Sequence, residues 1–130
     1  MADHGLMLYG NAIIVNTDFA SANAGIVKSF LGAVGKGWKD AVSNPSSAIE
    51  ALAKRNPAAN KELEERRFKL ALSGNVMTDY VVKNGMGNID NARFEKAINQ
   101  LSETYNYKTK PNAKLYFTDM YLPTGGFKLK

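Results

Sequence analysis

The chain has 130 residues, of which 45% are hydrophobic and 22% are charged. This length and composition are typical of one soluble globular domain, which at this size buries roughly two-thirds of the surface that its unfolded chain exposes. No apolar run approaches the ~20 residues that a membrane span needs, and the absence of cysteine excludes disulfides, thiolate nucleophiles and cysteine-ligated zinc.

The net charge of +5 is concentrated at the C-terminal end. Five lysines against one acidic residue give residues 106–130 a net charge of +4, so the rest of the chain carries +1. A surface that grips phosphates more often spreads Lys and Arg along one face of a folded element. We therefore ascribe the excess charge to solubility and expect no nucleic-acid partner.

Residues 1–5 are predicted to be a loose lead-in, which contains the single histidine, His4. The opening MADHGLMLYGN lacks the basic region and long apolar core of a secretory signal, so no signal peptide is expected in this chain. Residues 6–15, LMLYGNAIIV, are predicted to form a strand that Tyr-Gly-Asn interrupts and Asn16-Thr17-Asp18 ends. The continuous apolar run at 12–15 is typical of a strand that is covered on both faces.

A long helix is predicted to begin at Asn23, as its cap, and to end near Ser43. An apolar stripe at helical period is expected to face the interior, and it consists of Ile26, Phe30, Val34 and Trp38. Trp38 is therefore interpreted as a packing residue. Each of the four glycines in this helix costs about 1 kcal/mol relative to alanine. Close approach of another backbone at residues 32–35 is the favoured reason for them, and local weakness of the helix is the alternative.

Two Asn-Pro pairs, at residues 44–45 and 56–57, predict two further helix starts, with Asn as the cap and Pro in the first turn. The first of these helices is expected to end near Lys54. The second is expected to end near Leu72, before Ser73-Gly74. Its charged side chains predict a solvated face with two favourable pairs, Glu62–Arg66 and Glu65–Lys69.

The remaining elements are shorter. Residues 75–83 fit either a short helix or a strand, and residues 85–88 predict a turn. Asp90 is expected to cap a fourth helix that ends near residue 105, and a polar loop follows at 106–111. Burial, or a stacking wall for a flat ligand, would account for the aromatic side chains near the C-terminus, which are Tyr105, Tyr107, Tyr116, Phe117 and Tyr121.

No constellation of residues argues for catalysis. His4 has no predicted partner, so a Ser-His-Asp triad or a histidine-rich metal site is not expected. The acidic side chains lie mainly beside basic neighbours on predicted helix surfaces. We therefore expect a protein that is not an enzyme and that holds no metal and no cofactor. Tyr9 is a candidate cleft residue, because Gly10 permits a bend that could project the tyrosine side chain into a cleft.

The segment YGNAIIVN, followed by Asp-Phe and by a helix that ends in A-x-x-KGW-x-x-A-x-x-NP-x-x-AI, resembles the C-terminal part of substrate-binding proteins of ABC importers. The family is that of the thiamine-pyrimidine, taurine and nitrate binding proteins, also called thiamine biosynthesis-like. The resemblance continues at Gly85-x-Gly87-x-Ile89-Asp90 and at residues 116–123, which are similar to a closing Y-T-x-x-Y-L-P element. It spans residues 8–123. Ala24-Gly25 departs from the Pro-Glu that the family usually has after the capping Asn.

The resemblance implies the type II periplasmic-binding-protein fold, in which two α/β lobes close on a small molecule. This chain is expected to be a single domain over 1–130, mainly α with one or two short strands. It would hold the last crossing strand (6–15), a helical region (23–105), a closing element (114–123) and a tail (124–130). Much of the sheet and most ligand contacts would lie in sequence outside these residues. The cleft positions that the resemblance implies here are Tyr9 and Asn11.

The implied function is that of the substrate-binding component of an ABC importer, or of a truncated fragment of one. It would capture a small organic solute such as a pyrimidine, a sulfonate or a related compound. An ABC permease is the implied partner, and a periplasmic or exported location is the implied site of action. Self-association is expected to cover the apolar surface of such a fragment.

Two other functions remain open. A helical interaction module without a small ligand is the alternative. An enzyme similar to the fungal thiamine-pyrimidine synthases is disfavoured, because those enzymes use histidine and cysteines, whereas this chain has His4 alone and no cysteine.

Overall fold

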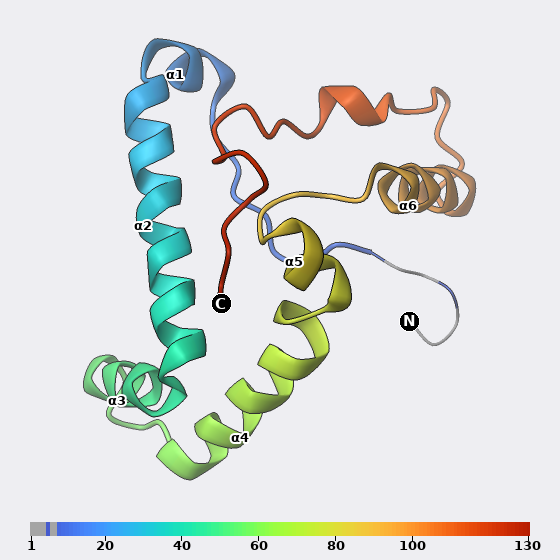
Figure 1. Ribbon diagram of the computed structural model, residues 1–130. Coiled ribbons are helices and arrows are strands. Elements are labelled where there is room, and N and C mark those ends of the chain that lie inside the picture. The colour runs from blue at the N-terminus through green and yellow to red at the C-terminus, as the bar shows by residue number, and fades with distance from the viewer. Residues whose placement is uncertain (1–4, 6–7) are drawn as a thin grey trace. The chain divides into compact units, whose positions relative to one another are not determined.

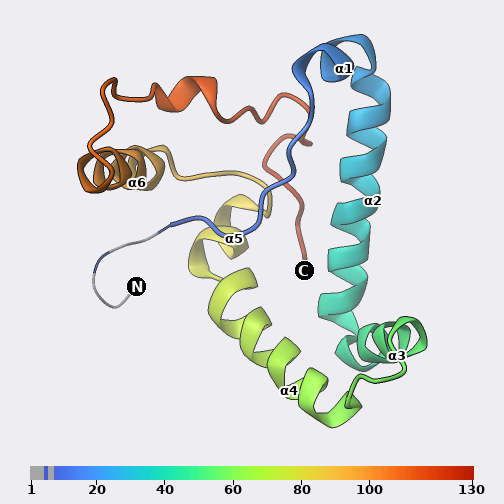
Figure 2. The ribbon, with the colours of Figure 1, turned by 180° about the vertical axis from the view of Figure 1, so that it is seen from behind.

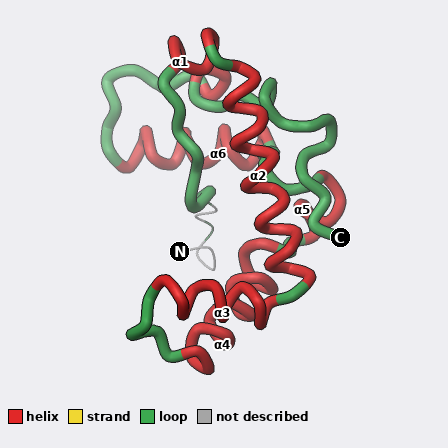
Figure 3. The backbone as a smooth tube through the Cα atoms, turned by 90° about the vertical axis from the view of Figure 1, so that its left-hand side faces the viewer, coloured by secondary structure: helices red, strands yellow, loops and turns green. Residues whose placement is uncertain are grey.

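The computed structural model describes residues 5 and 8–130, and the described chain is mainly helical, as the sequence predicts. The strand-type pairing among the described residues is limited to one isolated antiparallel bridge, between Met86 and Phe127. Figure 3 otherwise shows only helices and loops. No helix in this described part is both long and apolar enough to cross a membrane. The elements in chain order are α1 (Thr17–Ala22), α2 (Ala24–Ser43), α3 (Pro45–Arg55), α4 (Lys61–Ala71), a π-helical turn (Leu72–Val76), α5 (Asp79–Asn84), α6 (Asn91–Thr104) and a 3-10 turn (Ala113–Leu115) (Figure 1).

The described residues group into two compact units. The first combines the described part of Met1–Ala24 with Ile89–Met120, and therefore contains α1 and α6. The second combines Gly25–Asn88 with Tyr121–Lys130, and contains nearly all of α2 together with α3, α4 and α5. The assignment of residues 1–130 to a single domain stays a prediction.

The strand predicted over 6–15 does not form in the described part of that range. Residues 8–16 are neither helix nor strand, and residues 6–7 lie outside the described residues. A strand requires a hydrogen-bonded neighbour, and no neighbouring strand exists among the described residues. The apolar run that was expected to be covered on both faces is instead exposed, with Ile14 93% accessible.

The residues predicted to end that strand begin a helix. Asn16 caps α1, because its Oδ1 accepts a hydrogen bond from the backbone N–H of Phe19 at 3.0 Å. Asn23 ends α1, and its side-chain Nδ2 donates to the Phe19 carbonyl oxygen at 3.0 Å. The prediction that Asn23 caps the long helix is therefore wrong in its hydrogen bonding, although α2 does begin at the next residue.

The buried side of α2 is rotated from the predicted stripe. Ile26 and Phe30 are exposed, at 59% and 55%. The covered row follows the neighbouring helical positions, with Val27 buried and Leu31, Val34 and Trp38 half-buried. The helix carries two adjacent apolar rows, and the packing of the described chain covers only one of them. The prediction of a buried stripe is partly right for Val34 and Trp38, which are half-buried, and it is wrong for Ile26 and Phe30.

The first Asn-Pro pair starts a helix and the second does not. Asn44 caps α3 through a hydrogen bond from the Ser47 N–H to its Oδ1 at 3.1 Å, and Pro45 occupies the first turn. After Asn56-Pro57 the chain makes a turn, and α4 begins only at Lys61, where the Asn60 Oδ1 accepts from the Leu63 N–H at 3.0 Å. Asn60 determines where α4 begins, because its side-chain oxygen can cap the backbone N–H three residues later.

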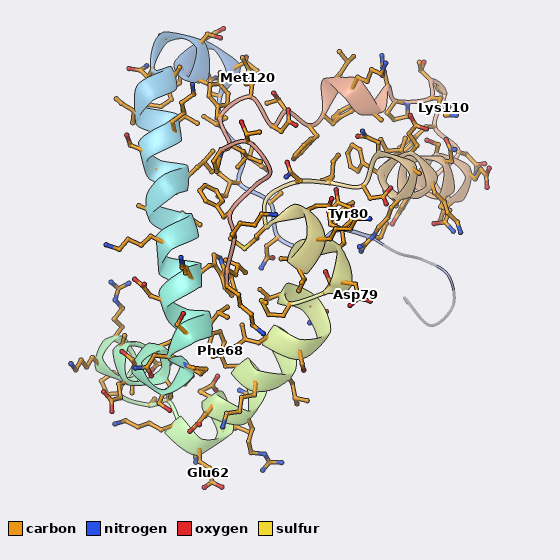
Figure 4. All side chains as sticks on the ribbon, in the orientation of Figure 1. Glu62, Phe68, Asp79, Tyr80, Lys110 and Met120 are labelled. Atoms are coloured by element: carbon orange, nitrogen blue, oxygen red, sulfur yellow. The ribbon has the colours of Figure 1, made fainter. Side chains whose placement is uncertain are left out.

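The charged face of α4 is solvated, as predicted. Lys69 pairs with Glu65 at 2.7 Å, which confirms that pair, whereas Arg67 pairs with Glu64 at 2.8 Å. The expected Glu62–Arg66 pair is not among the ion pairs of the described chain, and Glu62 points outward at the start of the helix (Figure 4). Ser73-Gly74 does not stop the helical path at once, because α4 passes into the π-helical turn. Of the ambiguous residues 75–83, the first two belong to the π-helical turn and residues 79–83 form most of α5, which Thr78 caps.

Asp90 caps α6 as predicted, since its Oδ1 accepts from the Arg93 N–H at 3.0 Å. The helix ends at Thr104, one residue before the predicted end. The predicted turn at 85–88 is also present. Gly85 and Gly87 have φ values of +82° and +103°, in the region that favours glycine.

The C-terminal segment 124–130, predicted as a tail, packs within the second unit. We call it the C-terminal strap. Phe127 and Met86 exchange two backbone hydrogen bonds of 2.9 Å, and Leu129 is among the most buried side chains of the described chain. Figure 2 shows the strap running between α2 and α5. The segment contributes Leu129 to the buried apolar side chains of the second unit.

Two glycines make room for the strap. A Cβ at Gly35 of α2 would overlap the Phe127 ring, with Cε1 of that ring at 2.7 Å and other ring carbons nearer. A Cβ at Gly85 would overlap the backbone of Gly125 and Gly126. The close approach predicted at residues 32–35 therefore exists at Gly35, but an aromatic ring and not a backbone makes it. At Gly32 no atom lies within 4 Å of the position that a Cβ would take.

Candidate functional site

Tyr9, the first predicted cleft residue, is held at the start of α6 within the first unit. Its hydroxyl oxygen accepts a hydrogen bond from the Asp90 backbone N–H at 2.7 Å. The Arg93 guanidinium carbon lies 4.3 Å from the centroid of its ring, and the ring meets that of Phe94 edge-on at 6.3 Å. Tyr9 is thus half-buried and oriented by three residues that lie far away in the sequence.

The rest of this arrangement fixes the chain around Tyr9. The Arg93 guanidinium also donates to the Leu8 carbonyl oxygen at 2.8 Å, so one side chain contacts both the backbone before Tyr9 and its ring. The Tyr9 hydroxyl accepts one bond and keeps its own proton for donation. Asn11, the second predicted residue, is exposed to solvent. Its carbonyl oxygen and amino group can therefore meet a ligand without prior rearrangement.

A pocket lies at the far end of α6, also within the first unit. It has a volume of about 290 Å³, and its lining residues are Asn99, Ser102, Glu103, Tyr107 and Lys110. The first three share one face of the helix, because they are spaced three and four residues apart. The other two come from the loop after the helix, where the Tyr107 N–H donates to the Ser102 carbonyl oxygen at 3.0 Å and holds the loop against the helix end. Figure 4 labels Lys110 in this loop.

One lining residue, Asn99, also has a polar atom that is buried from solvent and unsatisfied among the described residues. The Asn99 Oδ1 is buried and has no hydrogen-bond partner among the described residues. Buried polar atoms are nearly always paired, so an exception requires an explanation. The neighbouring Ser102 hydroxyl donates to the Ile98 carbonyl oxygen at 2.7 Å, so it cannot also donate to Asn99.

The aromatic residues near the C-terminus are largely outside the core. Tyr105, Tyr107 and Tyr116 are exposed, so the prediction of burial is wrong for these three. Phe117 and Tyr121 are half-buried. The rings of Tyr105 and Tyr107 stack on each other, with centroids 6.1 Å apart and planes 18° apart. An exposed stacked pair beside a pocket agrees with the alternative, a stacking wall for a flat ligand.

The described residues contain no group of three or more His, Asp or Glu side chains that could hold a metal ion. His4 lies outside the described residues. The structure does not bring Tyr9 or Asn11 into the lining of the pocket at the end of α6. These are therefore two separate candidate sites.

Sequence reasoning named Tyr9 and Asn11, whose role in binding stays a prediction, and it missed the pocket at the end of α6. The polar face of α6 resembles an ordinary solvated helix face in the sequence, since Asn99, Ser102 and Glu103 alternate with the apolar stripe of Ile98 and Leu101. A signal was present in the tyrosine-rich loop directly after the helix. It could not indicate which helix face the loop would return to.

Comparison with known proteins gives one match. The family model described as NMT1/THI5 like matches residues 1–48, which include Tyr9, Asn11, α1, α2 and the start of α3. The parts of the resemblance at 85–90 and 116–123 lie outside that match and stay predictions. No curated protein and no solved structure matches the chain. The matched family consists mostly of substrate-binding proteins. Over residues 1–48, which are less than half of its length, the chain is similar to the NMT1/THI5-like family.

Proposed function

We propose that this chain is the substrate-binding component of an ABC importer, or a truncated fragment of one, and that it captures a small organic solute. A pyrimidine, a sulfonate or a related compound is the proposed solute. The observation that carries the proposal is the family match over residues 1–48, because it contains both proposed contact residues, Tyr9 and Asn11. An ABC permease is the proposed partner of the full-length form, and its proposed location is periplasmic or exported.

The surroundings of Tyr9 support a contact role. Its ring is fixed between Arg93 and Phe94, so little side-chain freedom remains to be lost when a ligand binds. Its hydroxyl has a donor left after accepting from Asp90, and the exposed Asn11 amide offers both a donor and an acceptor two residues later. Such a pair can recognise the ring nitrogens and exocyclic groups of a pyrimidine or the oxygens of a sulfonate.

A thermal-shift screen with pyrimidines, sulfonates and flavin-like compounds tests the proposal on the 130-residue chain. We expect one class of compound to raise the melting temperature reproducibly. For that compound, Asn11→Ala should weaken binding about twofold to tenfold in a calorimetric titration, the effect of one lost hydrogen bond. Asn11 is the cleaner position because Tyr9→Phe also removes the acceptor for the Asp90 N–H.

Asn91→Ala is the matched control, since Asn91 is also exposed and belongs to α6 in the same unit. It should leave the affinity unchanged. Flat melting temperatures across the whole panel would contradict solute capture by this chain. The same flat result would favour the alternative, a helical interaction module that takes no small ligand.

Exposed apolar side chains support self-association as a further part of the proposal. Ile14, Ile26 and Phe30 are each more than half exposed, and exposed apolar residues in such number are typical of interaction surfaces. Sedimentation velocity at micromolar concentration should reveal a species heavier than the 14.2 kDa monomer. Phe30→Ser should shift the equilibrium toward the monomer without loss of helical circular dichroism. A wild-type chain that stays a clean monomer would contradict this part.

A further inference from the structure

One segment of the first unit combines positive charge with exposed apolar side chains. We call residues 105–116, YNYKTKPNAKLY, the lysine–tyrosine segment. It contains three lysines and no acidic residue. Its four large apolar or aromatic side chains are all exposed, and they are Tyr105, Tyr107, Leu115 and Tyr116. Solubility accounts for the lysines, but it does not account for the rings and the leucine that are exposed among them.

The backbone of the lysine–tyrosine segment is supported at both ends. At its start, the Tyr107 N–H donates to the Ser102 carbonyl oxygen at 3.0 Å. Near its end, the Asn112 side chain caps the 3-10 turn, which contacts α6 (Figure 1). Pro111 and Ala113 are half-buried, and all other residues of the segment are exposed. The lysines, the tyrosines and the leucine therefore lie on the outer side of a supported loop.

The charges of the segment are open to a partner. Lys108, Lys110 and Lys114 are exposed, and none of them belongs to an ion pair among the described residues. Each lysine close to an anionic surface strengthens the attraction about fivefold. A lysine ammonium lies at the end of a flexible aliphatic stem, so it can reach an anionic group while the neighbouring apolar side chains contact a less polar layer.

We propose that the lysine–tyrosine segment docks on the surface of a membrane that contains anionic phospholipids. The lysines contact the lipid phosphates. The tyrosine rings lie at the level of the head groups, where this amphipathic side chain is enriched in membrane proteins. Leu115, which is 78% exposed, contacts the boundary of the acyl chains. The contact is peripheral and reversible, because one leucine and three rings bury little apolar area.

A membrane fits the segment better than a nucleic acid, the other large polyanion. Nucleic-acid surfaces typically use arginine and open aromatic faces on which bases stack. The segment has no arginine, and Tyr105 and Tyr107 stack on each other with their centroids 6.1 Å apart. The ring faces between them are therefore closed to a base. Leu115 adds to a bilayer contact but offers no plane for a base.

Co-sedimentation of the 130-residue chain with vesicles tests the proposal. We expect it to bind phosphatidylcholine vesicles that contain about one-third phosphatidylglycerol, to bind pure phosphatidylcholine far more weakly, and to dissociate as salt is added. The combined Lys108→Gln, Lys110→Gln and Lys114→Gln variant should bind at least about tenfold more weakly. Leu115→Ser should weaken binding at least about threefold, because it removes the apolar contact.

A second triple variant with the same total charge is the matched control. Lys36→Gln, Lys39→Gln and Lys61→Gln replace three exposed lysines of the second unit, so both triple variants lose three positive charges. The control should bind anionic vesicles as the wild type does. Equal weakening by the two triple variants would overturn the proposal, because net charge alone would then explain the binding. Equal binding to anionic and neutral vesicles would overturn it as well.

A dye identifies the surface that contacts the membrane. The chain has no cysteine, so Thr109→Cys in the segment and Ser29→Cys in α2 each create one labelling position. Both residues are exposed, and Ser29 adjoins Phe30 of the exposed apolar row of α2, which is the rival surface. An environment-sensitive dye should shift to the blue on anionic vesicles at position 109 and not at position 29. The reverse pattern would show that α2 makes the contact.

Single-stranded DNA is the competing polyanion. If an oligonucleotide bound the chain more tightly than the anionic vesicles and displaced it from them, the proposal would be wrong and the segment would be a nucleic-acid surface. The vesicle experiment is independent of the thermal-shift screen. Solute capture at Tyr9 and Asn11 can fail while the lysine–tyrosine segment binds a membrane, and the reverse holds.

Discussion

Leu129→Ala is expected to lower the free energy of unfolding by about 2–5 kcal/mol, the range for removing a buried leucine side chain from a core. Leu129 is the penultimate residue of the chain, yet it is only 3% exposed. The two hydrogen bonds between Phe127 and Met86 hold the strap in place, and the Lys128 Nζ donates to the Lys83 carbonyl oxygen at 3.1 Å. Replacing Leu129 by alanine therefore removes apolar contacts at a position where these hydrogen bonds hold the backbone.

Urea denaturation followed by circular dichroism measures this effect, and Leu70→Ala is the matched control. Leu70 belongs to α4 in the same unit and is 72% exposed, so its truncation should change stability by no more than about 0.5 kcal/mol. Leu129→Met should cost less than about 1.5 kcal/mol, because it nearly conserves volume. If Leu129→Ala and Leu70→Ala had equal effects, the strap would not be a packed part of the second unit.

The sequence predicted those features that depend on neighbours within four residues. Asn44 and Asp90 were identified as caps because each places a side-chain oxygen three residues before a backbone N–H, and that relation is visible in the sequence. The Glu65–Lys69 pair was predicted for the same reason. A local signal could also mislead. Asn56-Pro57 predicted the start of α4, whereas the structure shows that Asn60 supplies the cap.

Features that depend on distant residues were not predictable. The hydrogen bond between Tyr9 and Asp90 joins positions 81 apart in the sequence. The glycine at position 35 could be recognised as a site of close approach, but nothing indicated that Phe127, near the other end of the chain, makes it. Likewise, α2 has two apolar rows, and local periodicity cannot determine which of them is covered. The strand predicted over 6–15 shows the same limit. Its apolar run was expected to be covered on both faces, whereas the Ile14 side chain is 93% accessible.

The candidate sites differ in the same way. Tyr9 and Asn11 came from a bend signal and a family resemblance, and the family match over residues 1–48 includes both. The pocket at the end of α6 depends on a loop that returns to its own helix, through the hydrogen bond from Tyr107 to Ser102. The buried Asn99 Oδ1, which has no hydrogen-bond partner among the described residues, is a further feature that no sequence pattern could reveal.

Two alanine substitutions three residues apart in α2 are expected to have opposite effects. Gly32→Ala should raise the free energy of unfolding by about 0.5–1 kcal/mol, since alanine is the better helix former and the new methyl group meets no atom within 4 Å. Gly35→Ala should lower it by about 1–3 kcal/mol, because the methyl group overlaps the Phe127 ring. The ring carbons concerned include Cγ, through which the ring is attached to Cβ, so a small rotation of the ring tip cannot relieve the overlap.

Urea denaturation of both variants, with Gly37→Ala as a second open position, provides the comparison. A double-mutant cycle with Phe127→Ala identifies the cause. Phe127→Ala alone destabilises the protein, but on that background Gly35→Ala should become stabilising, as Gly32→Ala is in the wild type. A gain in stability from Gly35→Ala in the wild-type chain would show that the Phe127 ring does not rest on α2. The C-terminal strap would then be held by Leu129, the Met86 bridge and the hydrogen bond from Lys128 to Lys83.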